Sequence, residues 1–351
     1  MTVILEDSIM IQGRPVTAGS KMLENFVSPL SATVADRLTR FGAIIANEAA
    51  AMHEFGIPML FGSDAEADSA PAAVRAVAGG AADCALCNDI FGMYRKYAAE
   101  DGCCYIHPTY GTVSRFGLVP TAASMDQIGV LCKDMRQGFQ LLSHIAGYDE
   151  KDGAMFTEKQ TVYAPGAKSF KLGIPACAEG LGLADKFDTT SVTLPYFELY
   201  KQVLYILFAG ETSNNISRYD GIKFGFRAEG HRGVNDMYLR TRTQGFGLQT
   251  KLAAIVGSVV LSQDYYTPYY EQAMRIRRLI KTSLPFDKCD VIALPTTLGD
   301  GVGAYENTAL YALAVLAGLP CISFRYKGKG VQMISDVRNE NALFSAWEVL
   351  A

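Results

Sequence analysis

The sequence predicts an α/β fold, because segments with the apolar spacing of helices alternate with short apolar segments typical of buried strands. Near the C-terminus, for example, residues 290–295 have the composition of a buried strand, and residues 308–317 that of a helix closed by Gly318. Of the 351 residues, 49% are hydrophobic and 19% are charged, which indicates a compact chain with a large core. No repeat or linker divides the sequence cleanly, so we expect a single domain over residues 1–351.

The first half of the chain shows this alternation. Residues 3–10 begin as a short strand, residues 32–41 have helical spacing, and residues 42–45 form a buried strand after that helix. Residues 70–78 are small and apolar, which favours a tightly packed helix. Residues 134–146 place apolar side chains on one helical face, with a glycine stop directly after them.

The second half continues the pattern. Residues 193–208 are strongly apolar and predict a strand followed by a helix. Residues 264–283 carry tyrosine and aliphatic side chains at helical spacing. The strand at 290–295 and the helix at 308–317 come next, and residues 321–324 form the last predicted strand.

Charge and composition exclude several classes of function. The net charge is −4 with both signs mixed along the chain, so we expect no direct contact with nucleic acid. The start has no basic leader and no apolar segment reaches 18 residues, so we expect neither a signal peptide nor a membrane span. Eight cysteines without a secretion signal indicate reduced thiols and a cytoplasmic protein. A zinc site would need two properly spaced cysteine pairs. Cys84 and Cys87 have such a spacing, but Cys103 and Cys104 are adjacent, so we expect neither a zinc site nor another cofactor.

The most specific motifs lie between residues 87 and 120. Residues 107–120 read HPTYGTVSRFGLVP, and residues 87–99 lead into them. This region resembles the amidase signature family, in particular the glutaminase subunit of the glutamyl-tRNA(Gln) amidotransferases. Further motifs of that family match KMLENF at 21–26, SNNISRYDG at 213–221 and QGFG at 244–247. The resemblance therefore covers nearly the whole chain.

This resemblance implies the amidase-signature fold. In that fold a large mixed central sheet is flanked by helices on both sides. The chain would then be one amidase-like domain, shortened at the N-terminus relative to the family.

The resemblance also assigns the three catalytic positions. The family uses a nucleophilic serine, a middle serine and a lysine, and these align with Met93, Ser69 and Glu6. A thioether has no proton to lose and cannot form an acyl-enzyme, so position 93 has lost the chemistry. Ser69 lies in a loop without the family's glycines, where a helix N-cap is the favoured interpretation. For Glu6, a solvated or ion-paired carboxylate near a strand end is favoured.

The same resemblance assigns the binding positions. Backbone N–H groups of residues 90–92, which are Ile90, Phe91 and Gly92, would form the oxyanion hole, and a phenylalanine in place of a glycine would reshape or fill the pocket. The ligand positions align with Arg277, Thr308 and Tyr219. An arginine at position 277 could still hold an acidic ligand, although a structural ion pair is favoured.

Two hypotheses follow. The first is a catalytically impaired amidase homologue, a pseudoenzyme that binds a protein partner resembling other amidotransferase subunits, or a small amide or acidic ligand. The alternative is an active amide hydrolase or glutamine amidotransferase subunit with a relocated nucleophile, such as Cys87 or Cys103 beside His107 or Glu6. A third variant, a chain that still assembles with amidotransferase subunits and modulates them, is not separated from the first by the sequence.

Overall fold

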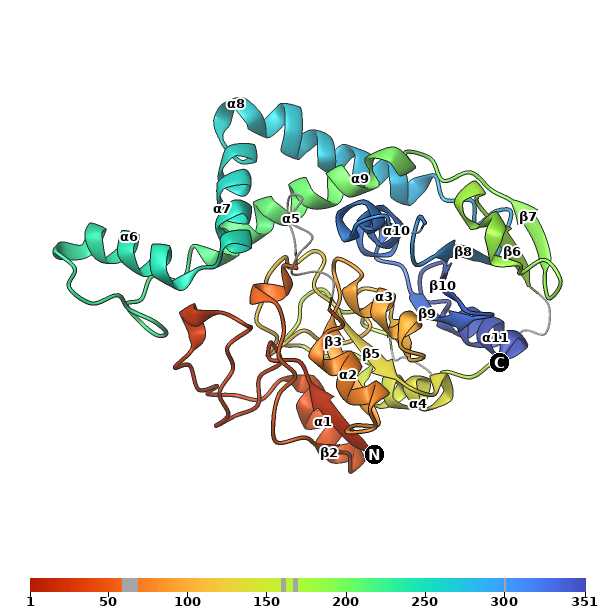
Figure 1. Cartoon of the computed structure of the whole chain (residues 1–351), viewed down its shortest axis with the longest axis horizontal. Helices are drawn as coiled ribbons and strands as arrows, with labels where there is room; N and C mark the ends of the chain where they lie inside the picture. The colour runs from red at the N-terminus through yellow and green to blue at the C-terminus, as the bar shows by residue number, and fades with distance from the viewer. Residues whose placement is uncertain (59–68, 159–161, 167–169, 300) are drawn as a thin grey trace.

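The computed structural model describes residues 1–58, 69–158, 162–166, 170–299 and 301–351. Figure 1 shows a body built around one sheet, with helix α6 (Gly233–Gly245) projecting from it and α7 (Leu248–Val260) standing beside it. Within the described parts of the chain, no helix is long and apolar enough to cross a membrane.

The described strands form one sheet in the order β2-β1-β3-β5-β4-β9-β10-β8-β6-β7. Their bounds are β1 (Thr2–Leu5), β2 (Ile44–Ile45), β3 (Cys84–Asn88), β4 (Cys104–His107), β5 (Ile128–Cys132), β6 (Lys171–Ile174), β7 (Asp188–Ser191), β8 (Val291–Pro295), β9 (Cys321–Tyr326) and β10 (Lys329–Ser335). Neighbours are parallel toward both edges of the sheet and antiparallel from β3 to β8 in its middle. The predicted mixed sheet is confirmed.

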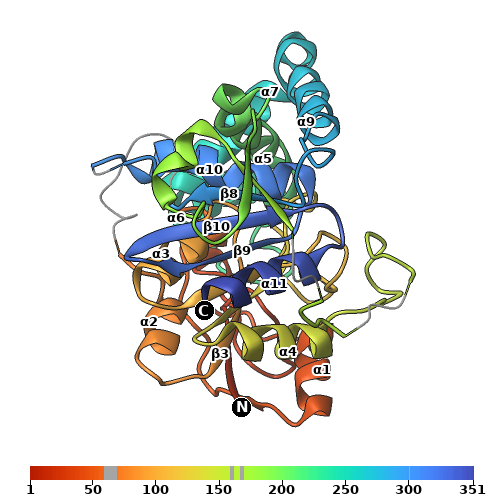
Figure 2. The same cartoon turned by 90° about the vertical axis from the view of Figure 1, so that its right-hand side faces the viewer.

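Helices cover both faces of this sheet. The remaining helices are α1 (Thr33–Phe41), α2 (Ala72–Ala78), α3 (Met93–Glu100), α4 (Met135–Ile145), α5 (Tyr200–Ile216), α8 (Gln263–Tyr265), α9 (Gln272–Thr282), α10 (Ala304–Ala317) and α11 (Glu340–Leu350). Alternate residues of β3 point to opposite faces, as the two-residue period of a strand requires. Cys84 and Leu86 join the core under α1, α4 and α11, whereas Ala85 and Cys87 join the core under α2 and α3. Figure 2 shows α4 and α11 side by side on the first of these faces.

Helix α4 matches its prediction closely. Phe139, Leu142 and Ile145 are fully buried along one face, and the ring of Phe139 stacks on that of Phe344 in α11 with centroids 4.5 Å apart. Asp134 caps the helix by accepting a hydrogen bond from the backbone N–H of Arg136 at 2.9 Å.

Four predicted elements differ from the structure. The strand predicted as buried at residues 42–45 is the two-residue edge strand β2, in which Ile44 is 65% exposed. Residues 193–199 form no strand, and α5 begins at Tyr200 after Pro195 and a short turn of helix at Phe197–Leu199. The first strand ends at Leu5 instead of continuing to residue 10, because the chain turns inward at Glu6 and keeps only isolated bridges to Ala50 and, through Ile9, to Leu118. The helix predicted at 264–283 contains a π-helical stretch, Tyr266–Glu271, around Pro268, which has no N–H for the regular ladder.

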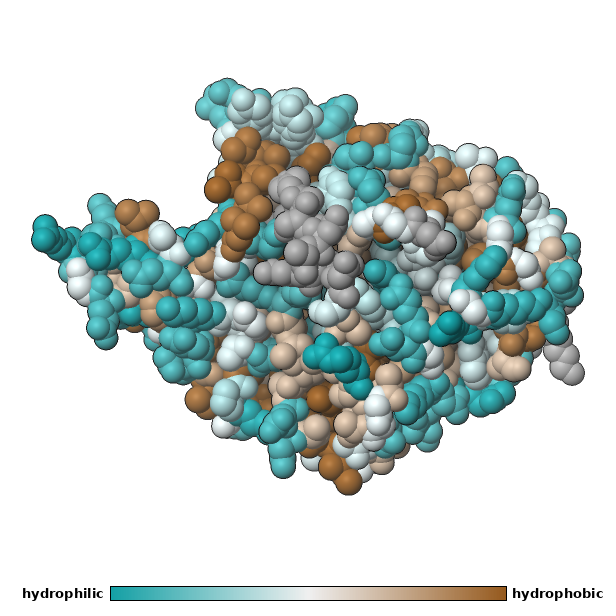
Figure 3. Space-filling view, viewed as in Figure 1, coloured by the Kyte–Doolittle hydropathy of each residue, from teal (hydrophilic) through white to brown (hydrophobic). Residues whose placement is uncertain are grey.

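Helix α7 leaves part of its apolar surface uncovered. Leu248, Ile255 and Val259 are 66%, 61% and 45% exposed, and Figure 3 shows brown atoms over this helix. These residues lie at helical spacing, so they form one stripe along the helix.

Candidate functional site

The loop between β3 and α3 is held by a buried ion pair. The carboxylate of Asp89 accepts hydrogen bonds from the backbone N–H groups of Tyr94 at 3.2 Å and Arg95 at 3.0 Å, and so caps helix α3. The fully buried guanidinium of Arg95 donates through Nε to the same carboxylate at 3.0 Å, and through Nη1 to the carbonyl of Tyr311. These contacts fix the loop to both α3 and α10.

Gly92 is required at the end of this loop for two physical reasons. Its φ angle is +83°, in the left-handed region that other residues rarely adopt. A Cβ atom on Gly92 would also lie 2.0 Å from Cγ of the Tyr311 ring. The loop therefore keeps a tight, closely packed turn at the point where Met93 begins α3.

The same loop carries the backbone N–H groups of the predicted oxyanion hole. Within the described structure, the N–H groups of Ile90, Phe91 and Gly92 donate to no protein acceptor. The ring of Phe91 packs edge-on against Phe208 of α5, with centroids 4.7 Å apart. Phe91 thus lines the cavity and is anchored in the core on its far side.

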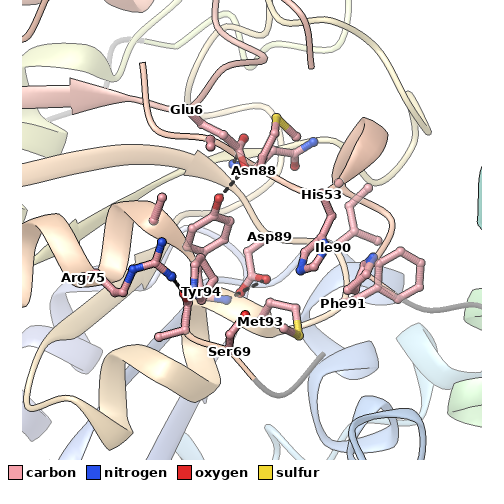
Figure 4. A pocket seen from close by; sticks show the side chains of 17 residues that line it. Glu6, His53, Ser69, Arg75, Asn88, Asp89, Ile90, Phe91, Met93 and Tyr94 are labelled. Carbon is pink, nitrogen blue, oxygen red and sulfur yellow. Dashed lines mark hydrogen bonds between the residues drawn. The ribbon is translucent and has the colours of Figure 1, made fainter. Parts of the chain in front are cut away.

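Glu6 lies at the end of β1, buried in a hydrogen-bond network (Figure 4). Its Oε1 accepts from the Tyr94 hydroxyl at 2.6 Å, and its Oε2 accepts from the Ser8 hydroxyl at 2.8 Å and the Asn88 N–H at 3.0 Å. Burial raises the pKa of Glu6 to about 7, although the three hydrogen bonds act in the opposite direction. The favoured interpretation as a solvated or ion-paired glutamate is wrong, because the side chain turns inward to meet donors that are all neutral.

A cavity of about 190 Å³ brings five of the predicted site residues together. They are Glu6, Ser69, Ile90, Phe91 and Met93. Figure 4 shows Ser69 beside Met93, with Glu6 on the far side of Tyr94. The hydroxyl of Tyr94 therefore engages the carboxylate at the position aligned with the lysine.

The interpretation of Ser69 as a helix N-cap is also wrong. Helix α2 begins at Ala72 with Pro71 at its N-cap, and Ser69 lies exposed two residues further back. Proline has no side-chain oxygen that could accept a hydrogen bond, so no side-chain cap forms there.

The three predicted ligand positions do not line this cavity. Arg277 donates to the Leu316 carbonyl at 2.7 Å and to the hydroxyl and carbonyl oxygens of Ser124 at 2.7 and 3.0 Å, so its favoured ion pair is replaced by neutral acceptors. Thr308 is buried in α10, where its hydroxyl donates to a backbone carbonyl one turn earlier. The buried ring of Tyr219 stacks on that of Phe55, with centroids 5.2 Å apart.

The geometry gives no support to a cysteine nucleophile. Cys87 and Cys103 are buried and do not line the cavity, and burial raises the pKa of each thiol. Glu6 lies close enough to Cys87 to raise the pKa of that thiol further, so this carboxylate opposes formation of a thiolate. Neither ring nitrogen of the buried His107 has a hydrogen-bond partner in the described structure, so no thiol–imidazole pair exists there. In the same parts of the chain, no group of three or more histidine, cysteine or acidic side chains is placed to hold a metal ion.

Tyr94 and Asn88 are the site residues that sequence reasoning missed. Asn88 joins the network to the next strand, donating to Asp126 at 2.9 Å and accepting from the Gln127 N–H at 3.0 Å. The sequence did not indicate a role for Tyr94, because the residue that its hydroxyl contacts, Glu6, is distant in sequence.

The fold and the loop define an amidase-type protein, and comparison with known proteins agrees. The family model described as Amidase matches residues 72–178 and 177–313. The A-subunit of the glutamyl-tRNA(Gln) amidotransferase from Trichodesmium erythraeum is 33% identical, with 98% of this chain and 82% of that protein covered. The corresponding protein of Lachnoclostridium phytofermentans is 34% identical over 92% of this chain and 74% of that protein. This chain belongs to the amidase family.

Solved structures show the same relationship. The crystal structure of the glutamyl-tRNA(Gln) amidotransferase A-subunit from Thermotoga maritima has a TM-score of 0.75 and 25% identity, covering 98% of this chain and 81% of that one. A 6-aminohexanoate cyclic dimer hydrolase complexed with substrate has a TM-score of 0.80 at 16% identity, covering 100% and 84% of the two chains. The second likeness concerns the fold alone.

Proposed function

We propose that this chain is a catalytically impaired amidase homologue, a pseudoenzyme that binds a small amide or acidic ligand without cleaving it. The proposal rests on one observation. Met93 occupies the position aligned with the nucleophile, while Glu6, at the position aligned with the lysine, is held in a buried hydrogen bond by Tyr94. Amide hydrolysis needs an activated nucleophile and a base within hydrogen-bond reach of it. At this site the aligned nucleophile is a thioether, and the aligned base is engaged by Tyr94.

Two other hydroxyl groups in the cavity are poor substitutes. Ser69 is exposed at the rim, and no side chain among the described residues accepts a hydrogen bond from it. The hydroxyl of Tyr94 is buried and donates to Glu6, and burial raises its pKa well above the usual value. Neither group is therefore activated for attack on a carbonyl.

Binding is supported by what the cavity keeps. The N–H groups of residues 90–92 still lack protein acceptors in the described structure, so a carbonyl or carboxylate oxygen of a ligand could accept from them. Relatives named as amidotransferase A-subunits suggest a second role, in which the chain associates with a protein partner resembling other subunits of such an assembly.

Ammonia release by the purified protein tests the proposal. Glutamine, asparagine and simple amides are incubated with the chain, with a thiol-blocked sample and with a known amidase as positive control. We expect no release above the buffer blank, and saturable binding of at least one of these amides by calorimetry. Release that thiol blocking abolishes would point to a cysteine nucleophile. Release that survives blocking would show that another residue attacks, and Ser69→Ala would then identify Ser69 or exclude it.

A further inference from the structure

A second cavity, of about 500 Å³, lies apart from the first and shares no lining residue with it. It is bounded by α9, by the end of α10 at residues 316–318, and by parts of the segment between residues 109 and 156. Its size is in the range of small-molecule sites, which span about 300–1,000 Å³.

The charge of this cavity is strongly positive. Arg277, Arg278 and Lys281 of α9 line it, and no acidic side chain does so among the residues that the structure describes. The chain as a whole has a net charge of −4, so the concentration of cations here is local. Within the described structure, neither Arg278 nor Lys281 forms an ion pair, and both are exposed.

Arg277 provides a fixed charge in the wall of the cavity. Its three hydrogen bonds to Leu316 and Ser124 hold the guanidinium in one orientation. The nearby Glu211 balances part of this charge, but its carboxylate already accepts from the N–H and the hydroxyl of Ser124. The unpaired charges that face an occupant are therefore those of Arg278 and Lys281.

The other walls are largely apolar or already engaged in hydrogen bonds. Phe156, Met274 and Leu316 contribute apolar surface. The hydroxyl of Tyr110 donates to the Ala123 carbonyl and accepts from Arg115, so it is occupied. An occupant would thus need a negative group for the cations and an apolar body for the walls.

We propose that this cavity binds an organic phosphate. A phosphate group carries up to two charges and three acceptor oxygens, which suits two unpaired cations beside a fixed third one. The attached apolar or aromatic body would lie along Phe156, Met274 and Leu316. A carboxylate has one charge and two oxygens, so it would leave part of the cationic surface unmatched.

Calorimetry with three probes at constant ionic strength tests the proposal. Phenyl phosphate carries both features, inorganic phosphate lacks the body, and benzoate lacks the second charge. We expect saturable one-to-one binding of phenyl phosphate, and affinities about tenfold weaker or worse for the other two probes. The double variant R278A/K281A should lower the affinity for phenyl phosphate by about tenfold or more. The control R275A/K288A removes the same charge from exposed positions outside the cavity and should bind like the wild type.

Three results would overturn the inference. The first is the absence of saturable binding of phenyl phosphate to the wild-type chain. The second is an equal loss in R278A/K281A and R275A/K288A, which would show a general charge effect. The third is benzoate binding as tightly as phenyl phosphate, because the preference for phosphate would then be absent. None of these results bears on ammonia release, so the proposed pseudoenzyme is tested separately.

Discussion

At the scale of single residues, Glu6 determines how the site responds to pH. Its carboxyl group is held between three donors in a dry environment, and its pKa is raised to about 7. The folded protein therefore binds this proton more tightly than the unfolded chain does. The stabilisation is complete below the usual pKa of a glutamate and is lost as the pH rises through about 7.

Replacement of Glu6 by glutamine should remove this dependence. Between pH 5 and pH 8, the free energy of unfolding of the wild-type protein should fall relative to that of Glu6→Gln by about 2 kcal/mol, since one pKa unit corresponds to about 1.4 kcal/mol. Urea unfolding at both pH values measures the difference. Glu24→Gln, at an exposed glutamate, should follow the wild type. Parallel pH profiles for the wild type and Glu6→Gln would contradict the prediction.

The sequence placed Glu6, Ser69 and Met93 at one site, but it could not give their surroundings. A resemblance to a family identifies equivalent positions along the chain. The Glu6–Tyr94 hydrogen bond depends instead on how the end of β1 packs against α3. Arg277 is a second example. Its sequence motif resembles that of the family, yet Arg277 and Met93 line different cavities.

At the scale of elements, the periodic and capped segments were predictable. Helix α4 has an apolar stripe, an aspartate cap and a glycine after its end, so its range was nearly correct. Strands β3 and β5 were not assigned, because both faces of these central strands are buried and their sequences show no alternation. The start of α5 was misjudged because an apolar segment around Pro195 reads like a strand until tertiary contacts are known.

Helix α3 depends on the buried pair between Asp89 and Arg95. Asp89→Asn keeps an oxygen that can cap the helix but removes the charge that compensates a fully buried guanidinium. We expect a loss of about 3–5 kcal/mol in the free energy of unfolding. Glu100→Gln, which weakens a 4.0 Å contact with the partly buried Lys96 on the same helix, should cost less than about 1 kcal/mol. Urea unfolding of both variants checks this, and a similar small loss in each would show that the buried charge is compensated in another way.

At the scale of the whole molecule, the last strands join the two halves of the sheet. Strand β9 pairs with β4 on one side and with β10 on the other, and β10 pairs with β8. The N-terminal group of strands therefore meets the group of β8, β6 and β7 only through residues 321–335 in the described sheet. The fold is completed by a segment near the end of the chain.

Two truncated chains should separate the contribution of β9 and β10 to folding from that of α11. A chain ending at residue 320 lacks β9 and β10 and leaves two unpaired strand edges, so we expect it not to fold. A chain ending at residue 335 keeps the sheet and loses α11, whose Leu343 and Phe344 are buried. It should fold with a lower Tm. Circular dichroism and limited proteolysis distinguish the two outcomes, and protease resistance of the chain ending at residue 320 would contradict the role given to β9.

The hydrogen bond between Tyr94 and Glu6 also bears on how this chain could change over generations. Glu6→Lys alone would leave the hydroxyl of Tyr94 and the N–H of Asn88 without their acceptor, at a cost of about 1–3 kcal/mol for each buried donor. Met93→Ser alone would create a hydroxyl group while the carboxylate of Glu6 stays engaged by the hydroxyl of Tyr94. Each single substitution is thus either destabilising or leaves the new hydroxyl without a free base, so hydrolysis in the proposed pseudoenzyme would require coordinated changes at positions 6 and 93. If the chain is the proposed pseudoenzyme, its loss of catalysis is difficult for point mutation to reverse, even though the amidase fold is intact.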